Sequence, residues 1–351
     1  DTPTHIAEAG IAAIRSGLTR YTPVGGIPEL RDAIIAKFRR QNAIEYDRSQ
    51  VLVSSGAKQT IYNLMMTVLD PGDEVVIPAP YWVSYPDMAC LADGVPVTPY
   101  AGPEQGYKLT PEQLEAAITP RTRLFVLNSP NNPTGAAYNR AELAAFGDVL
   151  AAHPRVLVAT DEIYEHVYWG QEPFCSFTSA CPDLYERTIT INGVSKCYAM
   201  TGWRIGYCGG PSEVVKAMSA VQSQSTSSAC SISQHAALAA LSGDQSCVEE
   251  MRRQFHARHD LFVDGLNQLP GFQVLPGSGT FYAFCDVSEA MARLELVDDA
   301  TFADFLLEKA RVAGVPGSAF GAPGHIRFSF ATSPGTLEQA LSQIANTLAK
   351  A

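Results

Sequence analysis

The sequence predicts an α/β fold in which a mostly parallel central sheet is flanked by helices and followed by a smaller α+β unit. Three observations lead to this prediction. Short β-rich runs alternate with helical patterns over most of the chain, which is typical of α/β proteins. Several of these runs are apolar throughout, as expected when helices cover both faces of a sheet. The pattern then changes near residue 256, and 351 residues suffice for two domains of roughly 100–200 residues each.

The predicted strands of the first part each lead into a turn or a polar segment. They are Gln50–Ser54, Glu74–Ile77, Arg123–Leu127, Arg155–Ala159, Thr188–Ile191 and Arg204–Cys208. Helical patterns lie between them, and one example is the i, i+3, i+7 spacing of Leu143, Phe146 and Leu150. Strands and helices therefore alternate, as the crossover connections of a parallel sheet require.

The last part of the chain has a different organisation. A helical pattern around Phe262 leads to the turn Pro270-Gly271, then to a β-rich region and a final helix around Leu341. We expect an N-terminal segment at residues 1–24, a large domain at 25–255 and a small domain at 256–351. The chain opens at Asp1 without an initiator methionine, so we expect segment 1–24 to be part of a longer natural N-terminus.

Charge and composition narrow the classes of function. The formal net charge is −11, which disfavours nucleic-acid binding because phosphate contacts need a basic surface. No apolar stretch approaches the roughly 20 residues of a membrane-spanning helix. The eight cysteines are scattered without a CxxC pair, so no metal site is predicted and reduced thiols in a cytoplasmic protein are expected.

The ends of the predicted strands carry the chemistry, since ligands of open α/β sheets bind beyond the carboxyl ends of the strands. After the first strand come Gly56, Ala57 and Lys58, followed by a helical pattern. A glycine turn at a helix N-terminus offers free N–H groups to a phosphate. An ordinary strand–helix turn explains the same residues equally well, and the spacing of a Walker A loop is absent.

The next three strand ends carry an aromatic, an amide and a carboxylate. Trp82 could stack on a flat heterocycle, although a core tryptophan is the more common case. Asn132 lies among turn-forming residues and could donate a hydrogen bond to a ligand oxygen. Asp161 ends an apolar strand, where a carboxylate needs a cationic partner such as an arginine or a protonated ring nitrogen. Tyr164 follows three residues later, on the same side of a helical turn.

The last strand ends lead to Lys196 and Arg204. Most lysines are solvated surface charges, so Lys196 alone would indicate little. Together, however, the strand ends supply a phosphate cradle, a stacking ring, an acceptor for a pyridinium, a phenol and an amine nucleophile. These are the groups that bind pyridoxal 5′-phosphate (PLP).

The run from Ser195 to Arg204, SKCYAMTGWR, resembles the PLP-lysine signature of class I aminotransferases. The resemblance continues through five further motifs and covers essentially the whole chain in order. These motifs are YTP and GIPELR at 21–31, YWVSY at 81–85, NNPTG at 131–135, DEIY at 161–164 and RFSFA at 327–331. Among class I enzymes, the chain is most similar to the prokaryotic aspartate aminotransferase subgroup, some members of which accept prephenate or aromatic amino acids.

The resemblance implies a PLP-dependent transferase of fold type I, a homodimer whose active sites lie at the subunit interface. Lys196 would be the Schiff-base lysine and proton shuttle, and Asp161 would keep the pyridine nitrogen protonated. Arg327 would bind the substrate carboxylate, with Asn132 and Trp82 beside it. The residues implied to hold the cofactor are Gly56, Ala57, Lys58, Trp82, Asn132, Asp161, Tyr164, Ser195, Lys196, Arg204 and, reaching over from the partner subunit, Tyr21. Two departures are that Gly193 stands where some members use a serine on the phosphate, and that relatives have some tens of residues before the counterpart of Asp1.

Three functions follow as alternatives. The first is ping-pong transfer of an amino group from aspartate to 2-oxoglutarate. The second keeps the chemistry with prephenate or aromatic amino acids as substrates. The third, of another class, is the ligand-sensing aminotransferase-like domain of a transcription regulator, although no basic winged-helix segment is present. A nicotinamide dehydrogenase is disfavoured because no GxGxxG motif follows a strand.

Overall fold

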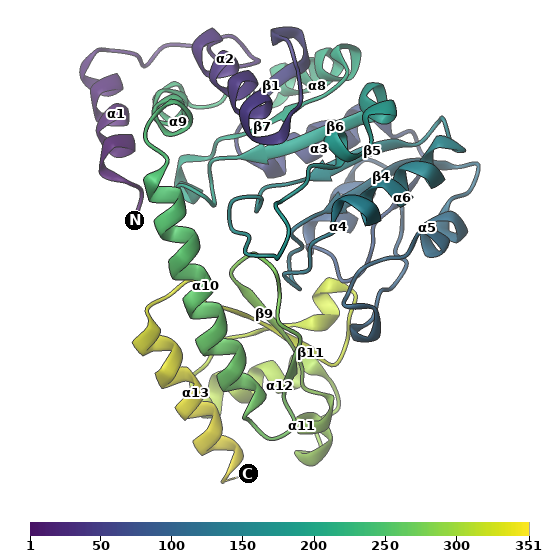
Figure 1. The fold of residues 1–351 in the computed structure, drawn as a ribbon, viewed down its shortest axis with the longest axis vertical. Helices are drawn as coiled ribbons and strands as arrows, with labels where there is room; N and C mark the ends of the chain where they lie inside the picture. Colours follow the sequence, from purple (N-terminus) through teal and green to yellow (C-terminus); the bar gives the residue numbers. More distant parts are fainter. Residues whose placement is uncertain (351) are drawn as a thin grey trace.

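The computed structural model describes residues 1–350 and has a large and a small α/β unit joined by one long helix, α10 (Figure 1). The α-helices are α1 Thr4–Arg15, α2 Pro28–Lys37, α3 Ala57–Val68, α4 Ser84–Leu91, α5 Pro111–Ala117, α6 Arg140–Ala151, α7 Phe177–Ala180, α8 Ser212–Ser225, α9 Ser231–Ser242, α10 Ser246–Asn267, α11 Ser288–Arg293, α12 Asp299–Phe305 and α13 Pro334–Leu348. The strands are β1 Val51–Ser54, β2 Glu74–Val76, β3 Val95–Val97, β4 Thr122–Asn128, β5 Leu157–Asp161, β6 Thr188–Gly193, β7 Gly206–Gly209, β8 Gln273–Val274, β9 Tyr282–Asp286, β10 Val315–Pro316 and β11 His325–Ser329.

The large unit is built on a seven-stranded sheet with the order β1-β7-β6-β5-β4-β2-β3. Strands β3, β2, β4, β5 and β6 pair in parallel, while β7 runs antiparallel to both β6 and β1. Strand β1 is therefore parallel to β6, and the carboxyl ends of β1, β4, β5 and β6 meet at one edge. The predicted mostly parallel sheet is confirmed.

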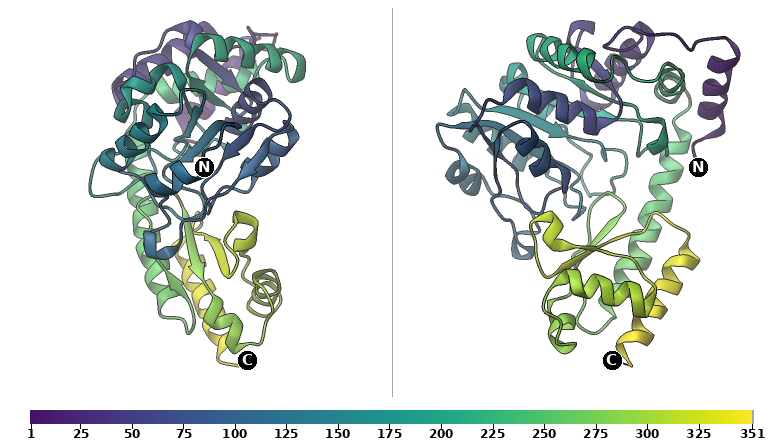
Figure 2. Two further views of the ribbon diagram at one scale, coloured as in Figure 1. Left: turned by 90° about the vertical axis from the view of Figure 1, so that its right-hand side faces the viewer. Right: turned by 180° about the vertical axis from the view of Figure 1, so that it is seen from behind.

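Helices cover both faces of this sheet, which explains why the strands are apolar throughout. Along β4, Leu124 and Val126 pack with α3, α4 and α8, whereas Phe125 and Leu127 pack with α5, α6 and α7. This alternation is the two-residue period of a strand. Figure 2 shows the helices on the two sides of the sheet.

The predicted strands match β1, β2, β4, β5, β6 and β7 with shifted ends. The strand expected from Arg204 begins only at Gly206, because Arg204 has a left-handed backbone with φ of 55°. The short strand β3 was missed, and it holds only three residues with a proline at its centre. In residues 1–350, no helix is both long and apolar enough to cross a membrane.

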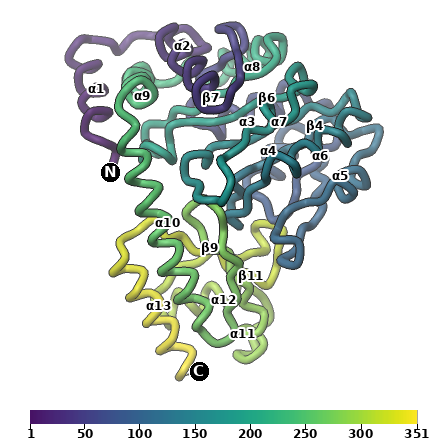
Figure 3. The backbone as a smooth tube through the Cα atoms, in the orientation of Figure 1, coloured from purple at the N-terminus to yellow at the C-terminus, as the bar shows by residue number. Residues whose placement is uncertain are grey.

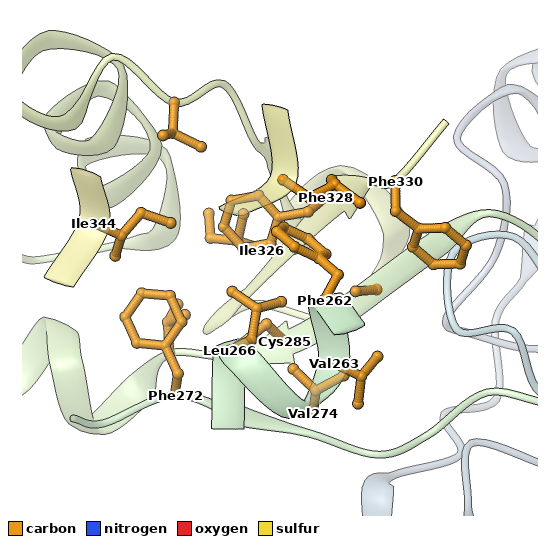
Figure 4. Close-up of a cluster of buried hydrophobic side chains, with 14 of the residues drawn as sticks. Phe262, Val263, Leu266, Phe272, Val274, Cys285, Ile326, Phe328, Phe330 and Ile344 are labelled. Carbon is orange, nitrogen blue, oxygen red and sulfur yellow. The ribbon is translucent and has the colours of Figure 1, made fainter. Parts of the chain in front are cut away.

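The small unit has an antiparallel sheet of four strands, β10-β11-β9-β8, packed against α10, α12 and α13. Phe262 and Leu266 of α10 and Ile344 of α13 enclose its core together with Ile326 and Phe328 of β11 (Figure 4).

The backbone trace follows α10 from the large unit into the small one, with the N-terminus near its upper end and the C-terminus at the far end of the small unit (Figure 3). The helix spans 22 residues, and residue 256, where the sequence predicted the second domain to begin, lies inside it.

Candidate active site

A cavity of about 390 Å³ opens at the edge where the parallel strands end. Ten residues predicted from the sequence line it: Ala57, Lys58, Trp82, Asn132, Asp161, Tyr164, Ser195, Lys196, Arg204 and Arg327. Gly56 immediately precedes this lining as the N-cap of α3. Tyr21 is not part of it, since its side chain is 92% exposed on the surface of the chain.

Lys196 lies three residues beyond β6, with its amine inside the cavity. The Nζ atom is 5.6 Å from the ring centre of Tyr164 and 5.5 Å from that of Phe281. Burial lowers the pKa of Lys196, and the positive charges of Arg204 and Arg327 lower it further against the opposing effect of Asp161. Burial is the largest of these causes. A lowered pKa makes the amine available as a nucleophile and base near neutral pH.

Asp161 ends β5 and is almost completely buried. Its Oδ2 atom accepts a hydrogen bond of 2.6 Å from the hydroxyl of Tyr85, and its Oδ1 atom accepts one of 3.2 Å from the N–H of Ile163. Burial raises the pKa of Asp161, while both hydrogen bonds and the charge of Lys196 counteract that rise. A buried carboxylate in this state favours a cationic partner in the cavity, because such a partner stabilises its charged form.

The start of α3 forms an anion-binding cradle. Within residues 1–350, the N–H groups of Ala57 and Lys58 have no hydrogen-bond acceptor, as is usual in the first turn of a helix. The guanidinium of Arg204 lies beside them, held by the carbonyl of Thr201 at 3.0 Å and that of Ser55 at 3.4 Å. Free N–H groups, the helix dipole and a guanidinium together suit a phosphate.

Two glycines make this cradle possible. A Cβ atom at Gly56 would overlap the guanidinium of Arg204, and φ at Gly56 is 90°. A Cβ atom at Gly206 would overlap the backbone nitrogen of Ala57. Only glycine therefore allows β7 and the start of α3 to approach so closely.

Arg327 comes from β11 of the small unit and reaches the same cavity. Its Nη1 atom donates to the side-chain oxygen of Asn132 at 3.0 Å. The guanidinium lies between the rings of Tyr282 and Phe320, 4.3 and 4.7 Å from their centres. Contact with these two rings restricts the guanidinium, so the edge that Asn132 does not occupy can bind a carboxylate through two hydrogen bonds.

Six lining residues were not assigned a role from the sequence: Val83, Tyr85, Asn128, Ile163, Thr201 and Tyr282. Tyr85 lies three residues after Trp82, and its ring packs edge-on against that tryptophan at 5.2 Å. This spacing is a signal that the sequence did contain. Tyr282 receives a weak hydrogen bond of 3.4 Å from the hydroxyl of Tyr164. Nothing local in the sequence indicates that contact, because it joins the two units.

The chain belongs to the aminotransferase class I and II family, whose model matches residues 1–344. It is an enzyme of the pyridoxal-phosphate-dependent type that this family comprises. Among curated relatives, it is 52% identical to the aspartate/prephenate aminotransferase of Nitrosomonas europaea, over 99% of this chain and 89% of the relative. It is 49% identical to the aspartate aminotransferase of Geobacillus stearothermophilus, over 98% and 87% of the two chains.

Solved structures of similar proteins share the complete fold. The aspartate aminotransferase of Rhizobium meliloti superposes with a TM-score of 0.95 at 46% identity, covering 99% of this chain and 88% of that one. The aromatic aminotransferase of Pyrococcus horikoshii also gives 0.95, at 36% identity and with 100% and 93% coverage. Since both superpose equally well, the fold alone does not distinguish their substrates.

The cavity fits PLP in three respects. The start of α3 with Arg204 suits the phosphate, and the buried carboxylate of Asp161 suits a protonated ring nitrogen. The amine of Lys196 lies in the same cavity with a lowered pKa. The residues present are therefore those that this cofactor requires.

Proposed function

We propose that the protein transfers the amino group of aspartate to 2-oxoglutarate, giving oxaloacetate and glutamate, in a ping-pong cycle. The observation that carries this proposal is the single cavity that holds Lys196, Asp161 and the stacked guanidinium of Arg327. An amine, an acceptor for the ring nitrogen and a carboxylate-binding group are the three elements that amino transfer needs.

The charges around the cavity support acidic substrates. The lining has four basic side chains, those of Lys58, Lys196, Arg204 and Arg327, and one acidic side chain, that of Asp161. The negative charges of a phosphate and of a substrate with two carboxylates balance the positive charge of this lining. A substrate with an uncharged side chain balances it less well. The Nζ atom of Lys58 lies 4.8 Å from the ring centre of Trp82 and is free to meet a second carboxylate.

Each residue has a defined part in the proposed reaction. When bound, PLP supplies an aldehyde that takes up the substrate amine and a ring that withdraws electrons from its Cα. Arg327 and Asn132 would hold the α-carboxylate in the cavity that also contains the amine of Lys196. With its lowered pKa, the amine of Lys196 would serve as the base that takes the Cα proton at Nζ and later gives it back. Asp161 would favour the protonated ring nitrogen, and Tyr164 and Asn132 would hold the ring oxygen.

The second candidate is amino transfer with prephenate or aromatic amino acids. It is supported by the relative named aspartate/prephenate aminotransferase and by the aromatic aminotransferase that superposes on this chain. Prephenate is also a dicarboxylate, so the charge of the cavity fits it as well. Rates of the two half-reactions with each substrate separate the candidates, and negligible rates with aspartate would remove the first.

A homodimer with shared active sites is part of the proposal. Tyr21 is 92% exposed, and Ile11, Ile14 and Leu18 just before it are exposed apolar side chains. Such a surface is typical of an interface, and Tyr21 would then complete the partner's cavity at the phosphate. We also place the protein in the cytoplasm, since in residues 1–350 all eight cysteines are unpaired thiols.

The division into domains is proposed in the same way. The large domain at 25–255 would contribute the cofactor groups, and the small domain at 256–351 would contribute Arg327. The segment 1–24 would then belong to the dimer contact.

The visible absorbance spectrum tests the function most directly. A yellow band that aspartate bleaches and 2-oxoglutarate restores is the expected result for both half-reactions. No band after addition of PLP would contradict the cofactor assignment in this protein. A band that does not respond to aspartate would move the proposal to prephenate and the aromatic substrates.

A further inference from the structure

A second polar cluster lies outside the cavity, around the carboxylate of Glu165. Glu165 forms an ion pair with Lys37 at the end of α2. It also accepts hydrogen bonds from Asn42 at 2.7 Å and from Asn192 at 2.9 Å, and His166 lies 3.3 Å away. Lys37, Asn42, Glu165 and Asn192 are each at most 6% exposed. None of them lines the cavity.

A buried ion pair of this kind is a poor source of stability. Desolvation of two charges roughly cancels their attraction, and apolar replacements are often neutral or stabilising. Burial alone would raise the pKa of Glu165, but the charges of Lys37 and His166 and the hydrogen bonds outweigh burial, so the pKa is lowered. The carboxylate is therefore ionised and well defined in position. The location of Glu165 indicates which parts of the chain this carboxylate holds together.

The cluster joins the two segments that carry the central site residues. Glu165 follows Tyr164 directly and comes four residues after Asp161, whereas Asn192 comes four residues before Lys196. The backbone pairing of β5 with β6 ends at Asp161 and Ile191, followed by one bond of 2.9 Å from Glu162 N to Ile191 O. Beyond that bond, the side chains of Glu165 and Asn192 connect the diverging segments.

Asn192 also shapes the loop that leads to Lys196. Its side-chain oxygen accepts the N–H of Gly193 at 2.8 Å, while its side-chain nitrogen donates to Glu165. The oxygen of the Asn192 amide thus bonds the loop that leads to Lys196, and its nitrogen bonds the segment that follows Asp161. On the other side, Lys37 donates to Asn42 at 2.8 Å and closes the cluster against α2 and the turn that follows it.

We propose that Glu165 and Asn192 are positioning residues that set the segment bearing Asp161 and Tyr164 against the loop bearing Lys196. This inference rests on the proposed function. A displacement of about 1 Å between reacting groups can reduce a rate by about 10²-fold, so a link of this kind has a large effect on turnover.

The test compares Asn192→Ala with Asn42→Ala. Each variant removes one amide from the same carboxylate at an equally buried position, and in each the ion pair with Lys37 remains. We expect similar falls in melting temperature. Only Asn192→Ala should lower kcat by about tenfold or more, weaken PLP binding and shift the pH midpoint of the cofactor's absorbance. Equal effects of both variants on these quantities, or a wild-type spectrum and kcat in Asn192→Ala, would overturn the proposal.

A second pair of variants leaves Asn192 and its bond to Gly193 intact. Lys37→Met combined with Glu165→Gln removes both charges but keeps an oxygen that can accept from Asn192. Lys37→Met combined with Glu165→Met removes both charges and the acceptor. The first double variant should keep the PLP dissociation constant within about twofold of the wild-type value and leave the pH midpoint of the absorbance unchanged. The second double variant should change both quantities. Equal PLP affinities and equal pH midpoints in the two double variants would contradict the positioning role.

The binding and absorbance measurements do not depend on turnover. If the wild-type protein binds PLP but does not transfer the amino group of aspartate, the proposed substrate fails while the positioning test can still be read. If amino transfer is normal and the variants show no difference, the positioning inference alone fails.

Discussion

The hydroxyl of Tyr85 donates a hydrogen bond of 2.6 Å to Oδ2 of Asp161. Tyr85 is buried, and burial together with the charge of Asp161 raises its pKa well above the usual value, so the hydroxyl keeps its proton and acts as the donor. This hydrogen bond stabilises the charged form of Asp161 in a place where burial favours the neutral form. Tyr85 thereby supports the carboxylate that faces the ring nitrogen.

Replacement of Tyr85 by phenylalanine should reduce activity without abolishing cofactor binding. A hydrogen bond to a charged group contributes roughly 1.5–3 kcal/mol, which corresponds to about 10- to 100-fold in kcat. The pKa of Asp161 should rise further, so the acidic limb of the kcat–pH profile should move to higher pH. Tyr46→Phe is the control, because its hydroxyl contacts Thr190 away from the cavity. A shift of the same size in the control would contradict the link to Asp161.

Asp161→Ala should separate binding from catalysis. The cradle at α3, Arg204 and Lys196 remain, so PLP should still bind. The lost electrostatic partner of the ring nitrogen should lower kcat by about 10²- to 10³-fold. Absorbance titration with PLP and steady-state kinetics measure the two effects. Near-normal turnover in this variant would refute the role of Asp161 in electron withdrawal.

Arg327→Lys should mainly impair substrate binding. Lysine keeps the positive charge but has no planar edge for a carboxylate and no flat face to lie between Tyr282 and Phe320. Loss of one charge-assisted hydrogen bond should raise KM by about 10- to 100-fold. PLP affinity should stay the same, which direct titration can show. Arg293→Lys, on the exposed face of α11, should leave KM unchanged.

Gly206→Ala tests the close approach of β7 to the start of α3. The added methyl group would overlap the nitrogen of Ala57, and overpacking typically costs about 1–3 kcal/mol. We expect a PLP dissociation constant at least about tenfold higher, since the shift falls on the cradle. Gly335→Ala is the matched control, because a Cβ atom there meets nothing within 4 Å. Unchanged PLP affinity in Gly206→Ala would mean that the cradle tolerates displacement.

Glu162 should make the stability of the protein depend on pH. Burial and the charge of Glu165 raise the pKa of Glu162 from 4.5 to about 8, although Ser176 and Phe177 donate to Oε1. Within residues 1–350, Oε2 has no hydrogen-bond partner. Between pH 4.5 and about 8 the folded protein holds a proton that the unfolded chain releases. The contribution of Glu162 to stability should therefore fall as pH rises through this window.

Glu162→Gln removes this dependence. The melting temperature of this variant should rise relative to that of the wild type as pH increases toward 8. The control Glu308→Gln, at an exposed position, should show no such rise. Thermal unfolding at a series of pH values measures the difference. A gap that stays constant with pH would show that Glu162 does not hold the proton.

The sequence predicted the large unit and eight of the ten cavity residues because strand ends of a parallel sheet meet at one edge, whereas Ser195 and Arg327 were implied by the family resemblance. Asp161 ends β5 and Lys196 lies three residues beyond β6, so the strand pattern placed both residues at this edge. The missed contacts are between residues far apart in the chain. Tyr85 meets Asp161 across 76 positions, and Tyr164 meets Tyr282 across 118. Such pairs depend on how helices dock on the sheet and how the two units pack, which no local pattern contains.

The exposed Tyr21 shows a different limit. Its motif indicated a cofactor ligand, but one chain places its side chain on the outer surface. Only a second subunit could bring it to a cavity, so its role remains a prediction.

The hydrophobic cluster of the small unit does not end at the unit boundary. It includes Phe262 and Val263, and it continues through Phe255 to Tyr164, which lines the cavity. The centres of the Tyr164 and Phe281 rings lie 5.5 Å apart in edge-to-face contact, and Phe281 in turn contacts Phe255. For protein engineering, this continuity implies that substitutions at Phe255 or Phe281 should change heat resistance and turnover together. Mutant libraries that spare Phe255 and Phe281 should keep the two properties independent.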